Sequence, residues 1–259
     1  MSNRSSTAVE PPKSPNRRGR IGPVTSEALS RLAYLLDRPL GCGVVQGPAR
    51  SGKSALLQTL ADGCSRRGAK TALIDGQGLD GRGLYWELAD NSRIGSLGES
   101  RPRRLAREIP DYMSGAVAAK FRLAIVLDHA DRLEHSAVQV LSRLLHEAEM
   151  TGGLTMIWSA TEPLQGEAAD VLLRFTELRI DCPAPTPSET AQFARDHWRN
   201  SGDADAADLP SGLEQQFAAL SHGDLRRAER LAKLSRLAAL AEGVPLNSEM
   251  LDSIAKELA

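Results

Sequence analysis

The chain has 259 residues, of which 41% are apolar and 25% are charged, and its 32 basic side chains nearly balance 33 acidic ones, for a formal net charge of −1. This length is enough for one large or two modest domains, and so balanced a charge identifies no partner. The three cysteines are widely spaced, which argues against a disulfide scaffold or a zinc site, and no apolar run approaches the ~18 residues of a membrane span, so we expect a soluble, cytoplasmic protein.

Residues 1–20 differ in composition from the rest of the chain. They combine Ser, Pro and Asn with several basic side chains and a single acidic one, Glu10. Such a segment cannot bury enough apolar surface to fold, so we predict a disordered basic tail. A tail of this kind either contacts nucleic acid or another acidic surface, or is simply solvated.

The first predicted elements surround a sequence motif. Leucines at helical spacing predict a helix over residues 26–36. A short buried strand is predicted at 42–45, and apolar residues return to helical spacing at 55–61. Between that strand and that helix the chain reads GxxxxGKS at 47–54, in the strand, loop, helix order that a phosphate-binding loop requires.

The residue types of this motif match the chemistry of phosphate binding. Gly47 and Gly52 permit a backbone in which successive N–H groups point at phosphate oxygens. Lys53 reaches the β- and γ-phosphates, and the hydroxyl of Ser54 supplies a ligand to Mg²⁺. We therefore predict a bound nucleoside triphosphate, against the alternative of a chance Gly-rich turn. The predicted nucleotide-binding residues are Gly47, Pro48, Ala49, Arg50, Ser51, Gly52, Lys53 and Ser54.

Strands and helices alternate after the loop. The pattern predicts a strand at 70–75, a helix at 84–89 and a Gly-, Ser- and Arg-rich loop at 91–104. A further strand at 121–128 is apolar almost throughout, as expected of a strand that is buried on both faces. Because parallel strands need crossover connections, the alternation predicts an α/β fold, a three-layer core whose parallel sheet is covered by helices on both faces.

Polar residues lie at the carboxyl ends of two of the predicted strands. Asp128 ends the strand at 121–128, and Ser159 and Thr161 lie at the end of the next strand, at 154–160. Ligands of open α/β sheets lie beyond the carboxyl ends of the strands, so we expect Asp128 to hold Mg²⁺ directly or through water, and one of the two hydroxyls to face the γ-phosphate. The alternatives are that Asp128 only caps the next helix and that the hydroxyls only end a strand.

The chain changes character after a short strand predicted near 177–181. Three prolines follow, and every later segment has helical spacing, which predicts helices near 188–201, 210–221, 224–242 and 247–258. The predicted division is a nucleotide-binding core over 21–183 and a small all-helical lid over 184–259. The third of these helices is predicted to have an apolar stripe and a solvated basic face. The stripe consists of Leu225, Ala228, Leu231, Leu234 and Ala238, and the basic residues are Arg226, Arg227, Arg230, Lys233 and Arg236.

These motifs, in this order, resemble the AAA+ ATPases, and within them the ExeA-type secretion ATPases and the TnsC-like transposition ATPases. The resemblance rests on the GxxxxGKS loop, the strands that end in Asp128 and Ser159, the proline-punctuated join at 180–190, Gly-Asp-Leu-Arg at 223–226 and the closing segment at 241–251. It covers the chain from about residue 26 to the end.

The resemblance implies ATP and Mg²⁺ as ligands and gives roles to matching residues. The residues that match catalytic and sensing positions are Lys53, Ser54, Asp128, Ser159 or Thr161, and Arg226. Ser159 or Thr161 would be the polar sensor beside the γ-phosphate, and Arg226 the lid arginine that reports the nucleotide to the helical part. Arg174 matches the position of an arginine finger for a neighbouring subunit, or is simply a surface residue of an amphipathic helix.

One position departs from the family pattern. Where the family has Asp-Glu, with the Glu polarising the attacking water, this chain has Asp128-His129. A neutral imidazole can accept a proton, so His129 is a candidate base, although it carries no fixed negative charge. Asp131 is a second candidate if the turn brings it round, or else it caps the following helix. The departure leaves nucleotide binding intact and puts hydrolysis in question.

The leading hypothesis is an ATP-driven switch or assembly factor that binds ATP and Mg²⁺ between core and lid, with hydrolysis that is weak if His129 is a poor base. One alternative is a non-hydrolysing ATP-dependent binding or scaffold module, and a second is a small-molecule kinase. We expect a protein partner or a homo-oligomer. DNA is a further candidate partner because of the basic tail and the cluster of Arg101, Arg103, Arg104 and Arg107, unless these arginines pair with nearby glutamates.

Overall fold

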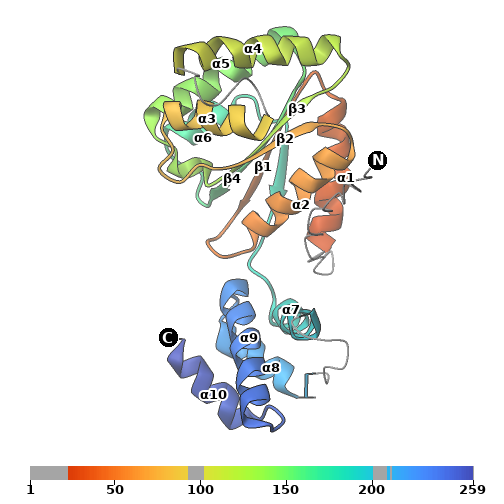
Figure 1. Cartoon of the computed structure of the whole chain (residues 1–259), viewed down its shortest axis with the longest axis vertical. Coiled ribbons are helices and arrows are strands. Elements are labelled where there is room, and N and C mark those ends of the chain that lie inside the picture. The colour runs from red at the N-terminus through yellow and green to blue at the C-terminus, as the bar shows by residue number, and fades with distance from the viewer. Residues whose placement is uncertain (1–22, 93–101, 201–208, 211, 259) are drawn as a thin grey trace, which may run out of the picture.

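The computed structural model describes residues 23–92, 102–200, 209–210 and 212–258. The basic tail predicted at 1–20 lies outside these residues, and so does Arg101. The described chain forms a core built around one β-sheet, followed by a unit of helices at the opposite end of the molecule (Figure 1). No helix in the described part of the chain is long and apolar enough to cross a membrane.

The sheet is parallel and has the strand order β2-β3-β4-β1-β5. Its strands are β1 (Leu40–Gly47), β2 (Lys70–Asp75), β3 (Leu123–Asp128), β4 (Leu154–Thr161) and β5 (Leu178–Asp181). All five strands predicted from the sequence are present, and β1 extends at both ends beyond its predicted range. Because β3, β4 and β1 are neighbours, their carboxyl ends lie side by side at one edge of the sheet.

Helices cover both faces of this sheet, so the predicted three-layer α/β fold is confirmed. One face is covered by α1 (Pro23–Asp37) and α2 (Lys53–Arg66), and the other by α3 (Gly81–Ser92), α4 (Pro102–Ala118), α5 (His135–Thr151) and α6 (Glu167–Leu173) (Figure 1). Strand β3 shows why its sequence is apolar throughout. Leu123, Ile125 and Leu127 pack on the α3–α6 side, whereas Ala124 and Val126 pack on the α1–α2 side.

The segment predicted as a loop at 91–104 is partly helical. Asn91 and Ser92 are the last residues of α3, and Pro102 is the first residue of α4, a helix that the sequence analysis missed. Pro102 is the first residue of the helix, where its missing N–H costs nothing. Pro110 lies inside the same helix, and a proline at an interior position argues against a helix in a sequence-based prediction. The helix forms because Leu105, Ile109, Met113 and Ala116 recur at helical spacing and are fully buried against the sheet.

The C-terminal helices form a third cluster of buried side chains, separate from the two clusters that flank the sheet. They are α7 (Pro187–Asn200), α8 (Leu213–Ser221), α9 (Leu225–Glu242) and α10 (Ser248–Glu257). Phe217 of α8, Leu231 of α9 and Leu251 of α10 have no exposed surface and hold the cluster together. We refer to α7–α10 as the helical unit.

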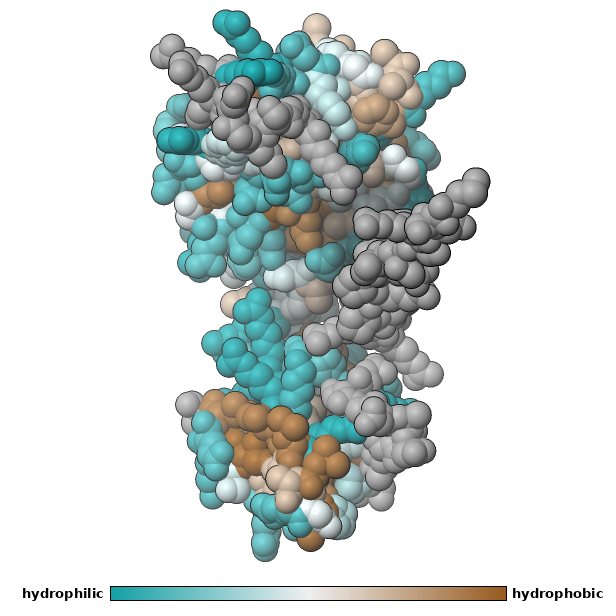
Figure 2. Space-filling view, viewed as in Figure 1, coloured by the Kyte–Doolittle hydropathy of each residue, from teal (hydrophilic) through white to brown (hydrophobic). Residues whose placement is uncertain are grey.

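Helix α9 differs in two respects from its predicted pattern. Leu234, predicted in the buried stripe, is 41% exposed, and with Leu237 at 62% and Leu240 at 69% it forms an outward apolar face. Figure 2 shows apolar residues gathered on the surface of the helical unit, in the region of α9 and α10. Arg236, predicted on the basic face, is buried and donates a hydrogen bond to the backbone carbonyl of Trp198. The rest of the predicted stripe faces the cluster, since Ala228 and Leu231 are buried and Ala238 packs against it, and the helix has a second, outward apolar face that was not predicted.

Candidate nucleotide-binding site

The GxxxxGKS loop connects β1 to α2 at the carboxyl edge of the sheet. Two of its residues have left-handed backbones, Gly52 at φ +95° and Arg50 at φ +66°. Gly52 is the N-cap of α2, and no side chain caps that helix. The N–H groups of the first turn of a helix lack intrahelical partners and carry its positive dipole end. The loop and the start of α2 therefore present backbone donors suited to an anion such as phosphate.

Lys53 lies at the centre of this loop and is 92% buried, with 8% of its surface exposed. Its Nζ donates hydrogen bonds to the backbone carbonyls of Gly47, at 2.8 Å, and Pro48, at 2.7 Å. Burial lowers the pKa of Lys53, while the neighbouring acidic groups, which include Cys182, Asp128 and Asp131, act in the opposite direction. The ammonium group is thus held inside the loop by weak neutral acceptors, which charged phosphate oxygens can replace.

The loop packs against the chain that leaves β5. A Cβ on Gly47 would stand 2.0 Å from the backbone carbonyl oxygen of Cys182, so only glycine fits at this point. The thiol of Cys182 donates to the carbonyl of Ser51 at 3.3 Å. The hydroxyl of Ser51 is buried without a hydrogen-bond partner. The phosphate loop and the start of the connection to the helical unit are therefore in direct contact.

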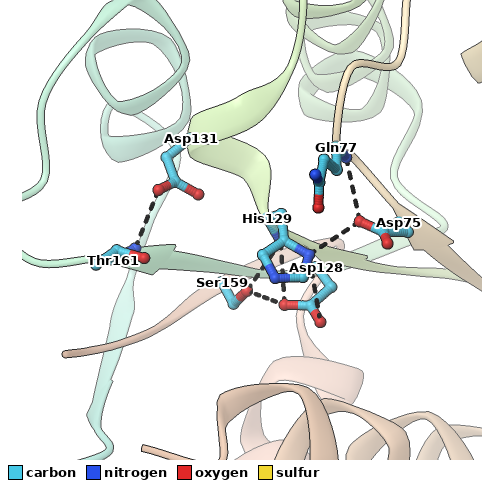
Figure 3. A network of polar contacts seen from close by, with 7 residues as sticks. All are labelled: Asp75, Gln77, Asp128, His129, Asp131, Ser159 and Thr161. Atoms are coloured by element: carbon cyan, nitrogen blue, oxygen red, sulfur yellow. Dashed lines mark hydrogen bonds and ion pairs between the residues drawn. The ribbon is translucent and has the colours of Figure 1, made fainter. Parts of the chain in front are cut away.

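Asp128 and Ser159 form the centre of a polar network at the ends of β3 and β4 (Figure 3). The hydroxyl of Ser159 donates to Oδ1 of Asp128. The backbone N–H of His129 is shared between the two side chains, at 3.0 Å from Asp128 Oδ1 and 3.1 Å from Ser159 Oγ. Ser159 is fully buried, and the side chain of Asp128 is 13% exposed. The carboxylate is therefore fixed in orientation but still accessible at the site.

The side chain of His129 is oriented by a residue that the sequence analysis did not place in the site. His129 has a left-handed backbone, at φ +49°, and its Nδ1 lies 2.9 Å from Oδ1 of Asp75, the last residue of β2 (Figure 3). Burial alone would raise the pKa of Asp75, but hydrogen bonds from His129 and from the N–H of Gln77 outweigh it, so the pKa of Asp75 is lowered. An ionised carboxylate only accepts, so Nδ1 carries the proton and Nε2 of a neutral ring holds the lone pair.

Asp131 and Thr161 also meet at this edge (Figure 3). The backbone N–H of Thr161 lies 3.4 Å from Oδ2 of Asp131, whereas Oδ1 of Asp131 is buried without a partner. Asp131 is part of a short 3₁₀ turn, η1 (Ala130–Arg132), and the N-cap of the following helix α5 is Glu134. Asp131 therefore does not cap α5, and the turn does bring its carboxylate toward the site. A buried carboxylate oxygen without a donor is a position where a cation or a water would be stabilised.

The helical unit touches the phosphate loop through the start of α9. Asp224 is the N-cap of α9, and the N-terminal helical residues Leu225 and Arg226 follow it. A guanidinium nitrogen of Arg50 lies 3.3 Å from Oδ2 of Asp224. The side chain of Arg226 is exposed, and its charge contributes to lowering the pKa of Asp75. Arg226 is therefore near the residues at the carboxyl edge of the sheet.

Other residues singled out from the sequence lie elsewhere. Arg174 is the exposed C-cap residue of α6. His135 and His146 are exposed on α5, with His135 bonded to Glu167 and His146 packed edge-on against Phe175. In the cluster of arginines considered for DNA binding, Arg104 pairs with Glu108 at 2.5 Å, which supports the alternative interpretation for this residue.

The residues at the site fit Mg²⁺ that arrives with a nucleotide. No group of three or more His, Cys, Asp or Glu side chains forms a metal site by itself within the described ranges. A carboxylate such as that of Asp128 and a hydroxyl such as that of Ser54 are oxygen donors of the kind that Mg²⁺ prefers, and Mg²⁺ commonly takes its remaining ligands from phosphates and water. The unpartnered carboxylate oxygen of Asp131 adds negative charge to the same edge. The set is too small to hold a metal alone and suits a nucleotide-bound one.

A parallel sheet with a GxxxxGKS loop after β1 and an acid at the end of β3 defines a P-loop nucleotide-binding fold. Residues 37–167, half of the chain, match the AAA domain family, and the chain belongs to that family. No curated protein matches the chain in a sequence comparison.

Solved structures of AAA+ proteins share the fold at low sequence identity. The Orc1 protein of Aeropyrum pernix, solved in complex with DNA, is 17% identical with a TM-score of 0.67, over 94% of this chain and 68% of that one. Domain III of the Thermotoga maritima replication initiation protein DnaA is 16% identical with a TM-score of 0.63, over 92% of this chain and 93% of that one. Cdc6p of Pyrobaculum aerophilum is 16% identical with a TM-score of 0.66, over 90% of this chain and 66% of that one. At these identities the likeness concerns the fold alone.

Proposed function

We propose that the protein is an ATP-driven switch or assembly factor of the AAA+ type, in which residues 21–183 act as the nucleotide-binding core and residues 184–259 as its lid. The observation that carries the proposal is the contact between the phosphate loop and the start of α9, because it joins the site that would sense phosphate to the helical unit that would respond. A ligand shifts the equilibrium between two positions of the lid only by its different affinities for these two states. A nucleotide that acts as a switch must therefore contact both the core and the lid.

The proposed roles follow from the geometry. Backbone N–H groups of the loop and Lys53 bind the phosphates, and Ser54 and Asp128 hold Mg²⁺. When bound, Mg²⁺ neutralises charge on the phosphates and orients them. Ser159 positions Asp128 through its buried hydroxyl, which keeps the carboxylate turned toward the metal site. Arg226, at the start of α9, contacts the nucleotide from the helical side.

Hydrolysis is proposed to be slow. Asp75 holds Nδ1 of His129 and leaves Nε2 as the only acceptor on the ring, so His129 can take a proton from a water that reaches Nε2. The imidazole carries no negative charge with which to polarise that water before the proton moves. The unpartnered oxygen of Asp131 offers a second acceptor at the same edge. A protein that stays in its ATP-bound state for a long time suits a switch better than a fast motor.

A protein partner or a second copy of the chain is proposed to read the state of the lid. The outward face of α9, with Leu237 and Leu240 more than half exposed, supports a partner, because apolar patches of this kind mark interaction surfaces. The similarity in fold to Orc1 bound to DNA supports nucleic acid as a further partner. The kinship with ExeA-type and TnsC-like ATPases remains a proposal that rests on the motifs and on the Gly-Asp-Leu-Arg segment at 223–226.

The proposal is tested first by binding. Titration with a fluorescent ATP analogue in the presence of Mg²⁺ should give saturable binding, and Lys53→Ala should weaken it about 10- to 100-fold, the worth of a charged hydrogen bond to phosphate. Lys70→Ala, an exposed lysine at the start of β2, is the matched control and should bind normally. Absence of binding by the wild-type protein, or equal binding by Lys53→Ala, would overturn the proposal.

A second candidate function is an ATP-dependent scaffold that never hydrolyses its ligand, and it is favoured specifically by His129. Phosphate release by the wild-type protein separates the two functions. Turnover above that of Asp128→Asn supports the ATPase, whereas binding with no such excess, with or without DNA, supports the scaffold. A gain of turnover in His129→Glu then identifies position 129 as the cause.

A further inference from the structure

The fourth residue of the phosphate loop, Arg50, extends away from the loop to the helical unit. Its guanidinium group pairs with Oδ2 of Asp224 at 3.3 Å. The other oxygen of the same carboxylate, Oδ1, accepts hydrogen bonds from the backbone N–H groups of Arg226, at 2.9 Å, and Arg227, at 3.3 Å. Asp224 therefore joins two structures at once, since one oxygen caps α9 and the other holds the phosphate loop.

A second contact lies beside this ion pair. A Cβ placed on Gly52 would stand 3.3 Å from Cδ1 of Leu225, so the first residue of α9 packs over the N-cap of α2. The side chain of Asp224 is 16% exposed, and that of Arg50 is 73% exposed. The contact thus has a shielded acid and an apolar neighbour, with the arginine approaching from solvent.

The backbone of Arg50 is in the left-handed region, at φ +66°, which residues other than glycine seldom adopt. Such a conformation persists where surrounding contacts support it, and the ion pair with Asp224 is a contact of that kind. Because Arg50 lies between Gly47 and Gly52, any change in the loop on phosphate binding moves the base of this side chain.

We propose that Arg50 is a positioning residue, which through Asp224 sets where the start of α9, and with it Arg226, stands relative to the phosphate loop. The inference rests on the proposed function, since it concerns the same site and names the connection by which loop and lid are coupled. The backbone N–H of Arg226 is hydrogen-bonded to the capping side chain, so a shift of Asp224 moves the backbone of Arg226 with it. Through this pair, phosphate binding changes the position of the helical unit, and the position of the helical unit changes the affinity for phosphate to the same extent.

An alternative role for Arg50 is that its side chain binds phosphate directly. The positioning role and this alternative predict different effects of a substitution at Asp224. Asp224→Asn keeps a side chain that caps α9 and removes the charge that attracts Arg50. If Arg50 acts through Asp224, then Arg50→Gln and Asp224→Asn should each weaken ATP binding by about 2- to 5-fold, the worth of a partly exposed ion pair, and the double variant should be no weaker than either one. If Arg50 binds phosphate itself, only Arg50→Gln weakens binding. Independent, additive losses from the two variants also overturn the proposal.

The matched control is Arg38→Gln. Arg38 forms a partly exposed ion pair with Glu177 at 3.2 Å, away from the phosphate loop. Loss of this pair removes a comparable surface interaction, and ATP affinity should stay at the wild-type value. A loss in this control equal to that in Arg50→Gln would show that the effect is one of general stability and would overturn the proposal.

A second measurement does not depend on ATP binding. Spin labels at Ser65→Cys on α2 and Ser253→Cys on α10, both exposed positions, report the distance between core and helical unit, because the three native cysteines are buried. Without nucleotide, Arg50→Gln and Asp224→Asn should broaden the distance distribution, and Arg38→Gln should not. An unchanged distribution in both variants overturns the positioning role. Failure of the wild-type protein to bind ATP, with a broadened distribution in the variants, would instead overturn the proposed function and leave the contact between loop and lid in place.

Discussion

The substitution His129→Glu places a third carboxylate among the groups that end β2 and β3. In the wild-type protein Nδ1 of His129 lies 2.9 Å from Asp75 Oδ1 and 3.7 Å from Asp128 Oδ2. The substitution removes the hydrogen bond to Asp75, worth about 1 kcal/mol between partly exposed groups. It also brings like charges to within about 4 Å, where they repel by about 1 kcal/mol in water and about 4 kcal/mol at an effective dielectric constant of about 20.

The exposure of each partner decides which end of that range applies. The side chain of Asp75 is 65% exposed, so its repulsion is screened toward the lower value, whereas that of Asp128 is 13% exposed. Together with the lost hydrogen bond, the free energy of unfolding should therefore fall by about 3–6 kcal/mol, which lowers Tm by about 6–24 °C for a chain of this size. Adding Asp75→Asn to His129→Glu should recover about 1 kcal/mol because it removes one of the repelling charges.

Urea denaturation at neutral pH in metal-free buffer measures these differences. His129→Gln is the matched control, since it loses the ring without adding charge and should cost only about 1 kcal/mol. Added Mg²⁺ should restore part of the stability of His129→Glu and none of that of His129→Gln, because only the former gathers extra negative charge for the ion. Equal stability of His129→Glu and His129→Gln, or no recovery with Asp75→Asn, would refute the electrostatic reasoning.

Three further predictions concern stability. Ser159→Ala should lower the free energy of unfolding by about 1.5–3 kcal/mol, because it removes a buried hydrogen bond to a carboxylate, and a loss below about 0.5 kcal/mol in urea denaturation would contradict this. Burial raises the pKa of Cys42 to about 12 and that of Cys64 to about 11, so both thiols stay protonated in the folded state while unfolded thiols ionise near pH 8.5. Stability contributed by these thiols is complete below about pH 8.5 and declines as the pH rises toward the folded pKa values, and Cys42→Ala with Cys64→Ala should flatten the decline in unfolding measured from pH 8 to 10.5. Leu231→Ala should cost about 2–5 kcal/mol in the helical unit, as seen by unfolding with a probe on α10, and a smaller loss would indicate that the cluster repacks.

The sheet could be predicted well because each strand carries a local signal. The run at 121–128 is apolar on both faces, and the register that pairs it with β2 and β4 keeps every alternate side chain in one of two cores. Helix α4 could not be predicted because Pro102 and Pro110 mask an apolar stripe that only the finished core makes visible. The exposure of Leu234 and the burial of Arg236 on α9 were missed for a related reason, since the width of the buried face is decided by packing against α7, α8 and α10.

The candidate site also contains some residues that local sequence patterns predict and others that only the folded structure brings together. The loop at 47–54 and Asp128 could be recognised because their spacing and their place after apolar strands are local properties. The partner of His129 could not, because Asp75 comes beside it only through the pairing of β2 with β3, which sets Asp75 opposite Asp128. The ion pair of Arg50 with Asp224 joins residues on opposite sides of the domain join predicted after residue 183, and no periodicity relates them.

The crowding at Gly47 changes how substitutions in the phosphate loop should be interpreted. A side chain there would overlap the carbonyl of Cys182 at 2.0 Å before any phosphate is bound. In a mutational scan, substitutions at Gly47 should thus lower stability as substitutions in the folded core do, whereas substitutions at Lys53 and Ser54 should act mainly on ligand affinity. A loss of activity at the first glycine of the motif therefore reports first on the contact between the phosphate loop and the chain that leaves β5, and by itself it does not separate a packing defect from a loss of nucleotide binding.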